Sequence, residues 1–228
     1  MLNTEQSARN ETRQLFLASA LAIAAIMFLG FAKNYYLRAW LGTRAISPMV
    51  HVHGMVMTAW VVLFLTQTLL VARRRTDLHC RLGIGGAFLA IVVVALGAYT
   101  IHNSILRHHL AGSAELYALT FVAFDGLSLL LFGGLIFVAL RLRSRPPIHK
   151  RLMLMATISL LPPAYGRAVA YLTHRHVQIL VLALMALSVL VCVSIDTLRH
   201  RRLHPAFGWG GGLVLISNLF TYLAQIAD

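Results

Sequence analysis

Histidines are the residues of this chain with the clearest chemical potential. The 228-residue sequence holds 11 of them, although only 12% of its residues are charged. Neutral imidazole nitrogens bind zinc, copper and haem iron, so two histidines on different helices suit a haem and three suit a copper or zinc ion. Which histidines can meet depends on the elements that carry them.

The composition predicts that these elements are helices in a lipid bilayer. Hydrophobic residues make up 59% of the chain, whereas soluble domains carry about 25% charged residues. A helix needs about 20 apolar residues to cross roughly 30 Å of hydrocarbon. We therefore predict an all-α, polytopic transmembrane bundle of about seven helices, formed by residues 15–226 as one domain after a cytoplasmic segment, residues 1–14. The predicted spans are Leu15–Ala32, Gly54–Ala72, Ile84–Ile101, Tyr117–Leu140, Leu152–Leu172, Val177–Ile195 and Ala206–Ile226.

Basic residues predict the orientation of the bundle. With the N-terminus in the cytoplasm, 14 lysines and arginines fall on the inner side and five on the outer side, as the positive-inside rule requires. The net charge of +13 is thus explained by membrane topology rather than by nucleic-acid binding. We expect a multi-pass protein of the bacterial inner membrane, in contact with the lipid bilayer.

Repeated residues before three predicted spans indicate hairpin pseudo-repeats. Leu78-His79 and Leu203-His204 are followed by glycines at the same spacing, and His149 precedes the fifth span in a similar way. Prolines predict where helices begin or bend. Ser47-Pro48 and Pro146-Pro147 favour helix starts, and Pro162-Pro163 predicts a kink within the fifth span.

The histidines fall in two tiers. On the outer side, His51 and His53 project about 200° apart on a helix, so they cannot both bind one ion. Gly54 favours burial of the His51 face and Gln67 favours burial of the His53 face, which leaves the choice open. The predicted metal ligands are His51, His53, His102, His174 and His176.

The inner tier consists of His79, His149, His200 and His204, and all of these except His200 lie just before a span. Two of them can bind one centre, or each can have a structural role near lipid phosphates. The residues predicted to bind a cofactor in one tier or the other are His51, His53, His102, His79 and His149.

Three polar residues lie within the predicted spans. Asp125 and Arg167 are the charged ones, and Asn218 lies in the outer half of the seventh span. An isolated charge in the bilayer costs at least a few kcal/mol, so we expect Asp125 and Arg167 to pair or to line a polar cavity. A proton relay or a transport path is one function of such a group, and a purely structural pair is another.

Several motifs resemble those of a bacterial family of multi-pass membrane proteins with no assigned activity. The resemblance covers about residues 28–170 and implies no mechanism. More loosely, histidines at opposite helix ends are similar to those of cytochrome b561-type proteins and of membrane proteins tied to cytochrome oxidase maturation. The fourth span lacks the outer histidine of the b561 pattern, so one haem or one metal is implied rather than two. The motifs are Phe31–Leu37, His51-x-His53-Gly54, Trp60, Gln67, Leu78-His79-x-Arg81-Leu82-Gly83 and His149–Met153.

The leading hypothesis is a membrane protein that binds haem b, or a copper, iron or zinc ion, through the outer histidines. Its role would be electron transfer or assembly of a respiratory complex, with respiratory-chain or other membrane proteins as partners. The alternatives are a transporter or channel with a polar path at Asp125 and Arg167, and a structural subunit of a larger complex. An enzyme is less favoured because the spans show no arrangement of nucleophile and base.

Overall fold

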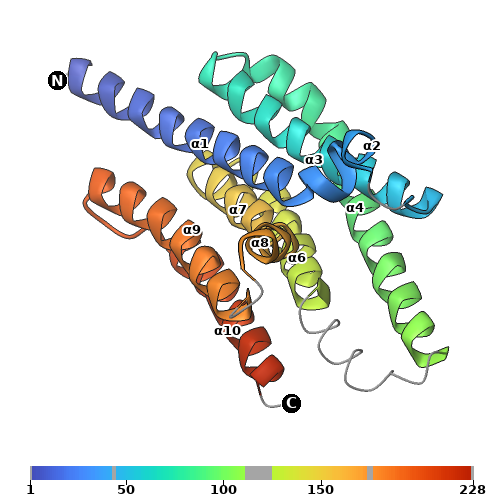
Figure 1. The fold of residues 1–228 in the computed structure, drawn as a ribbon. Coiled ribbons are helices and arrows are strands. Elements are labelled where there is room, and N and C mark those ends of the chain that lie inside the picture. The colour runs from blue at the N-terminus through green and yellow to red at the C-terminus, as the bar shows by residue number, and fades with distance from the viewer. Residues whose placement is uncertain (1, 43–44, 111–124, 174–176, 227–228) are drawn as a thin grey trace.

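The computed structural model describes residues 2–42, 45–110, 125–173 and 177–226. This part of the chain is helical and contains no strand, which confirms the all-α prediction. Figure 1 shows the helices as a bundle of long rods. The elements are α1 (Leu2–Phe31), the π-helical turn η1 (Ala32–Tyr36), α2 (Arg38–Leu41), α3 (Pro48–Ala72), α4 (Thr76–Leu110), α6 (Leu127–Arg141), α7 (Pro146–Ile158), α8 (Pro162–Leu172), α9 (Val177–His200) and α10 (Pro205–Ile226).

The helices are apolar and long enough for a membrane protein. In the described residues five of them can cross a bilayer by length and composition, or up to six if α7 and α8 are one bent span. The shorter apolar helix α6 corresponds to the fourth predicted span, whose residues 117–124 lie outside the described ones. A helical membrane bundle is therefore confirmed, and the predicted number of seven is approximate.

The predicted kink separates α7 from α8. The two helices are bent by 42° at their junction, where Pro162 and Pro163 begin α8. Proline lacks an amide donor and its ring collides with the preceding turn, so α7 stops at Ile158. Ser159, the residue after α7, donates its hydroxyl to the Ala156 carbonyl oxygen at 2.8 Å.

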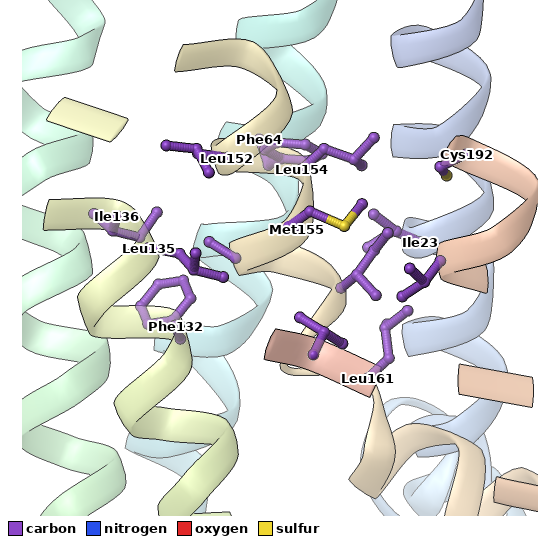
Figure 2. Packing of buried hydrophobic residues seen from close by; sticks show 14 of the residues in the cluster. Ile23, Phe64, Phe132, Leu135, Ile136, Leu152, Leu154, Met155, Leu161 and Cys192 are labelled. Carbon is purple, nitrogen blue, oxygen red and sulfur yellow. The ribbon is translucent and has the colours of Figure 1, made fainter. Parts of the chain in front are cut away.

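Helix α7 is the centre of the bundle. It packs against α6, α10, α1 and α9, and residues 154–158 are all buried. In Figure 2, Leu154 and Met155 of α7 lie among apolar side chains that come from other helices, with Phe132 of α6 and Ile23 of α1 nearby. A helix that is apolar on all sides is stable only when it is surrounded, so α7 fixes the relative positions of its neighbours.

The predicted helix starts at proline are confirmed. Helix α3 begins at Pro48, and the Val50 amide donates to the Ser47 side chain at 3.4 Å. Helix α7 begins at Pro146. Both prolines occupy the first turn, where the missing amide hydrogen leaves no internal bond unmade.

Two short turns contain arginine in a left-handed backbone conformation. Arg74 between α3 and α4 has φ 60°, and Arg201 between α9 and α10 has φ 56°. Around Arg74 the amides of Arg74 and Arg75 donate to the carbonyls of Val71 and Leu70 at 3.1 and 2.8 Å. This is a Schellman motif, whose left-handed position usually holds glycine. A side chain at such a position costs about 1–2 kcal/mol.

Helices α1 and α8 approach so closely that only glycine fits between their backbones. A Cβ atom at Gly30 would lie 2.4 Å from the carbonyl oxygen of Ala164. Gly30 and Ala164 are both buried. Close approach at a small residue is the way in which helices gain contact inside a membrane, where lipid tails remove the hydrophobic driving force.

We predict that Gly30→Ala destabilises the bundle by about 1–3 kcal/mol, because the added methyl group can be accommodated only by a backbone shift. The free energy of unfolding in detergent measures the change. Gly85→Ala is the matched control, since no atom lies within 4 Å of a Cβ atom there. Equal stability of the Gly30→Ala and Gly85→Ala variants would show that α1 and α8 do not pack in this way.

Candidate functional site

The first turn of α7 directs three basic side chains toward different helices. Successive residues on a helix are about 100° apart, so His149, Lys150 and Arg151 diverge. His149 faces α4 and α6, Lys150 lies over the Phe16 ring of α1 at 5.0 Å, and Arg151 reaches α9. The first turn of the central helix is thus joined to four other helices.

His149 meets His79, the first histidine of α4. Their ring centroids are 6.3 Å apart and the ring planes are 78° apart. His149 Nδ1 lies 2.8 Å from the Ala139 carbonyl oxygen on α6. A carbonyl only accepts hydrogen bonds, so Nδ1 carries the proton and Nε2 keeps a free lone pair. One of the two options for the inner tier, a pair of histidines at one position, is therefore geometrically available.

Gln67 of α3 completes the surroundings of His79. Its Nε2 donates to the His79 carbonyl oxygen at 3.3 Å. The Gln67 Oε1 and His79 Nδ1 atoms are both buried and find no hydrogen-bond partner among the described residues. Buried polar atoms are nearly always bonded to protein, water or a ligand. Each of these two atoms could still accept or donate a hydrogen bond.

Two features of the pair are also found among histidines that bind metals. With metal–nitrogen bonds of about 2.0–2.1 Å, two imidazoles whose ring centroids are 6.3 Å apart could both bind one ion. Histidine ligands also usually donate their second ring nitrogen to a carbonyl or carboxylate, as His149 does to Ala139.

Arg151 forms a buried ion pair with Asp196 of α9. Arg151 Nε donates to Oδ2 at 2.9 Å and Nη2 donates to Oδ1 at 2.7 Å, and the two side chains are 2% and 0% exposed. Arg151 Nη1 also donates to the Pro147 carbonyl oxygen at 2.7 Å. Both residues lie one position outside the predicted spans, so neither is among the charged residues that the sequence predicts within the bundle. The signal was a lone aspartate at the end of an otherwise apolar helix.

His204, another inner histidine, begins α10 rather than joining the pair. The Ala206 amide donates to His204 Nδ1 at 3.1 Å, which satisfies one of the free amides at the helix start. Burial lowers the pKa of His204, and the nearby Arg151, Lys150 and Arg202 cations lower it further, against the opposing effect of Asp196. His204 therefore has a structural role, as an acceptor in its neutral form.

The outer histidines of α3 lie in different surroundings. His51 is exposed, with Nε2 3.4 Å from Arg38 Nη1 and its ring 5.7 Å from that of Tyr35. His53 is half-buried, and its Nδ1 lies 3.5 Å from Thr100 Oγ1 of α4. Trp60, on the same face of α3 as His53, is buried. The question left open by the sequence is answered in favour of the His53 face.

The other predicted outer ligands are not brought into this arrangement. His102 is exposed on α4, while His174 and His176 lie outside the described residues. Within the described part of the chain, no group of three or more His, Cys, Asp or Glu side chains is placed to hold a metal ion. The outer metal site stays a prediction.

Arg167 of α8 lies against Phe31, the last residue of α1. Its guanidinium lies 4.5 Å from the centre of the Phe31 ring, and Nη1 donates to the Pro163 carbonyl oxygen at 3.0 Å. It interacts electrostatically with Asp125 and with His53. Asn218, by contrast, donates to Val214 of its own helix at 2.8 Å. The expected pairing of Asp125 with Arg167 stays a prediction.

Comparisons with known proteins give no match. No family model, no curated protein and no solved structure is similar to this chain. The function must therefore be argued from the site.

We predict that Asp196→Asn costs about 3–5 kcal/mol of stability, because it leaves the Arg151 charge buried and without its counterion. The apolar double variant Arg151→Met/Asp196→Leu should recover most of this loss. Denaturation of the purified protein in detergent measures both. The control is Asp77→Asn, which removes an exposed pair with Arg75 at 3.7 Å and should cost at most about 1 kcal/mol. Similar losses for Asp77→Asn and Asp196→Asn would contradict the burial of the pair.

We predict that His204 makes the protein less stable in mild acid. Its pKa is lower in the folded chain than its ordinary value of 6.5, so the unfolded chain binds more protons and stability falls as pH falls. The contribution is complete above about pH 6.5 and is lost as pH drops through the folded-state pKa. His204→Asn keeps a side-chain acceptor without this titration. Its stability, measured between about pH 7 and pH 5, should change less than that of the original protein, and parallel curves would contradict the assignment.

Proposed function

We propose that this multi-pass membrane protein binds a transition-metal centre between His79 and His149. The observation that supports the proposal is the pairing of these imidazoles from α4 and α7 at 6.3 Å, with one tautomer fixed by a backbone carbonyl and buried polar atoms left without partners. The preferred site is therefore the inner pair, His79 and His149, rather than the outer histidines that the sequence favoured.

Haem b needs only two nitrogen ligands from the protein, because the porphyrin supplies the other four ligands of the iron. A bare copper ion would need a further ligand, for which Gln67 Oε1 or a water molecule is available. His79 and His149 would hold the iron in the first case. The Ala139 carbonyl would hold the His149 ring in place in both cases.

The role we propose is electron transfer or assembly of a respiratory complex. When bound, the centre would supply a reversible one-electron carrier. The residues of this chain hold the two imidazoles at a fixed separation, and the half-buried rings limit the access of water to them. The loose resemblance to cytochrome b561-type and oxidase-maturation proteins agrees with this role.

A transporter is the second candidate, supported by one observation. Arg167 interacts electrostatically with His53 and Asp125, which come from separate elements at the outer end. Uptake of a solute by reconstituted vesicles, lost in Arg167→Gln, would favour this function over metal binding.

The test is metal and haem analysis of the protein purified from membranes in mild detergent. We expect about one iron or copper per chain, with a Soret absorption band if the centre is haem. His79→Ala and His149→Ala should each lose most of it. His51→Ala and His102→Ala are the matched controls, since both side chains are exposed, and should retain the metal.

Two outcomes would overturn the proposal. If the His51→Ala and His102→Ala variants lose the metal while the inner variants keep it, the outer site is correct instead. If the original protein, folded and expressed with iron and copper supplied, holds neither, it does not bind a metal centre. Thermal unfolding of each variant separates loss of a ligand from loss of the fold.

A further inference from the structure

Three short turns of the bundle gather arginines at one end of the molecule. The α3–α4 and α9–α10 turns lie at the same end as the start of α1 in Figure 1. The start of α7 lies between them, because His149 contacts His79 at the start of α4 and Arg151 pairs with Asp196 near the end of α9. We name this end the basic face and define it by exposed arginines of the three turns and the first turn of α4, namely Arg73, Arg74, Arg75, Arg81, Arg141, Arg143, Arg145, Arg201 and Arg202.

Two of these arginines occupy backbone positions that disfavour them. Arg74 and Arg201 have φ values of 60° and 56°, in the left-handed region where glycine or asparagine is the usual residue. Arg74 lies two residues after the end of α3, and Arg201 lies one residue after the end of α9. Helix termination alone would be served better by glycine. An arginine retained at the cost of backbone strain, in both turns, indicates that its side chain is needed there.

The basic face is strongly cationic, because the two aspartates near it each pair with an arginine and do not offset the remaining arginines. Asp77 makes an exposed ion pair with Arg75 at 3.7 Å, and Asp196 is buried against Arg151. The face stands at the ends of membrane-spanning helices, where the phosphates of lipid headgroups lie. Guanidinium groups bind phosphate with two parallel hydrogen bonds, which an ammonium cannot do.

We infer that the basic face binds the headgroups of anionic phospholipids, with Arg74 and Arg201 as the principal contacts in their two turns. A phospholipid that carries a net negative charge is the occupant that the position of the face at the helix ends favours. Clusters of arginine beside membrane helices attract such lipids. This inference does not depend on metal binding at His79 and His149.

The experiment measures equilibrium binding of a fluorescent phosphatidylglycerol analogue to the full chain in neutral detergent. We expect Arg74→Gly and Arg201→Gly each to weaken binding about fivefold, and the double variant about 25-fold, as for removal of one and two surface charges. Because glycine relieves the left-handed strain, both variants should unfold at the same temperature as the original protein, or higher, when no lipid is present. Loss of lipid affinity without loss of stability is the distinctive result.

Controls separate this role from others. Arg107→Gln removes an exposed charge at the far end of α4 and should leave binding unchanged. Equal binding of a phosphatidylcholine analogue, or displacement by inorganic phosphate at matched ionic strength, would overturn the assignment to anionic lipid. Unchanged binding by the double glycine variant would overturn the role of these two arginines. A double variant that is less stable without lipid would show that the arginines support the turns themselves.

Discussion

The ion pair between Arg151 and Asp196 sets the position of the first turn of α7, on which the rest of the bundle depends. Arg151 is 2% exposed, so its guanidinium is stable only where Asp196 and the Pro147 carbonyl accept its hydrogen bonds. That requirement permits one rotation of α7. With Arg151 directed to α9, the two preceding residues must face other helices.

The same rotation creates the histidine pair. His149 is directed away from the ion pair, toward His79 and the Ala139 carbonyl. A structural device and a candidate metal site are thus built from neighbouring residues of one helical turn. A metal ion between the histidines would be bound by neutral imidazoles. The positive charge of Arg151 is balanced separately, by the Asp196 carboxylate. His149 and Arg151 are thus close together on α7, but each has its own hydrogen-bond partners.

The two histidine tiers differ in their burial and in the residues that surround them. The inward face of α3 runs from His53 past Trp60 and Phe64, which are buried, to Gln67 beside the inner pair. His51 is on the other side of the helix and is exposed next to Arg38. At the other end of the bundle, Arg167 contacts the Pro163 carbonyl oxygen and the Phe31 ring. In the part of the chain that the structure describes, only the inner end places two imidazole rings together.

The sequence by itself determined the fold class, the approximate spans, the proline-initiated helices and the break at Pro162, because apolar length and the missing proline amide act locally. It also selected His79 and His149 as candidates, through their repeated position before helices. Tertiary structure alone decided that these two meet while His204 caps a helix, and that Arg151 and Asp196 are buried partners rather than loop charges. The physical reason is that pairing between residues 45 to 70 positions apart depends on how helices rotate and pack around α7, which no local pattern encodes.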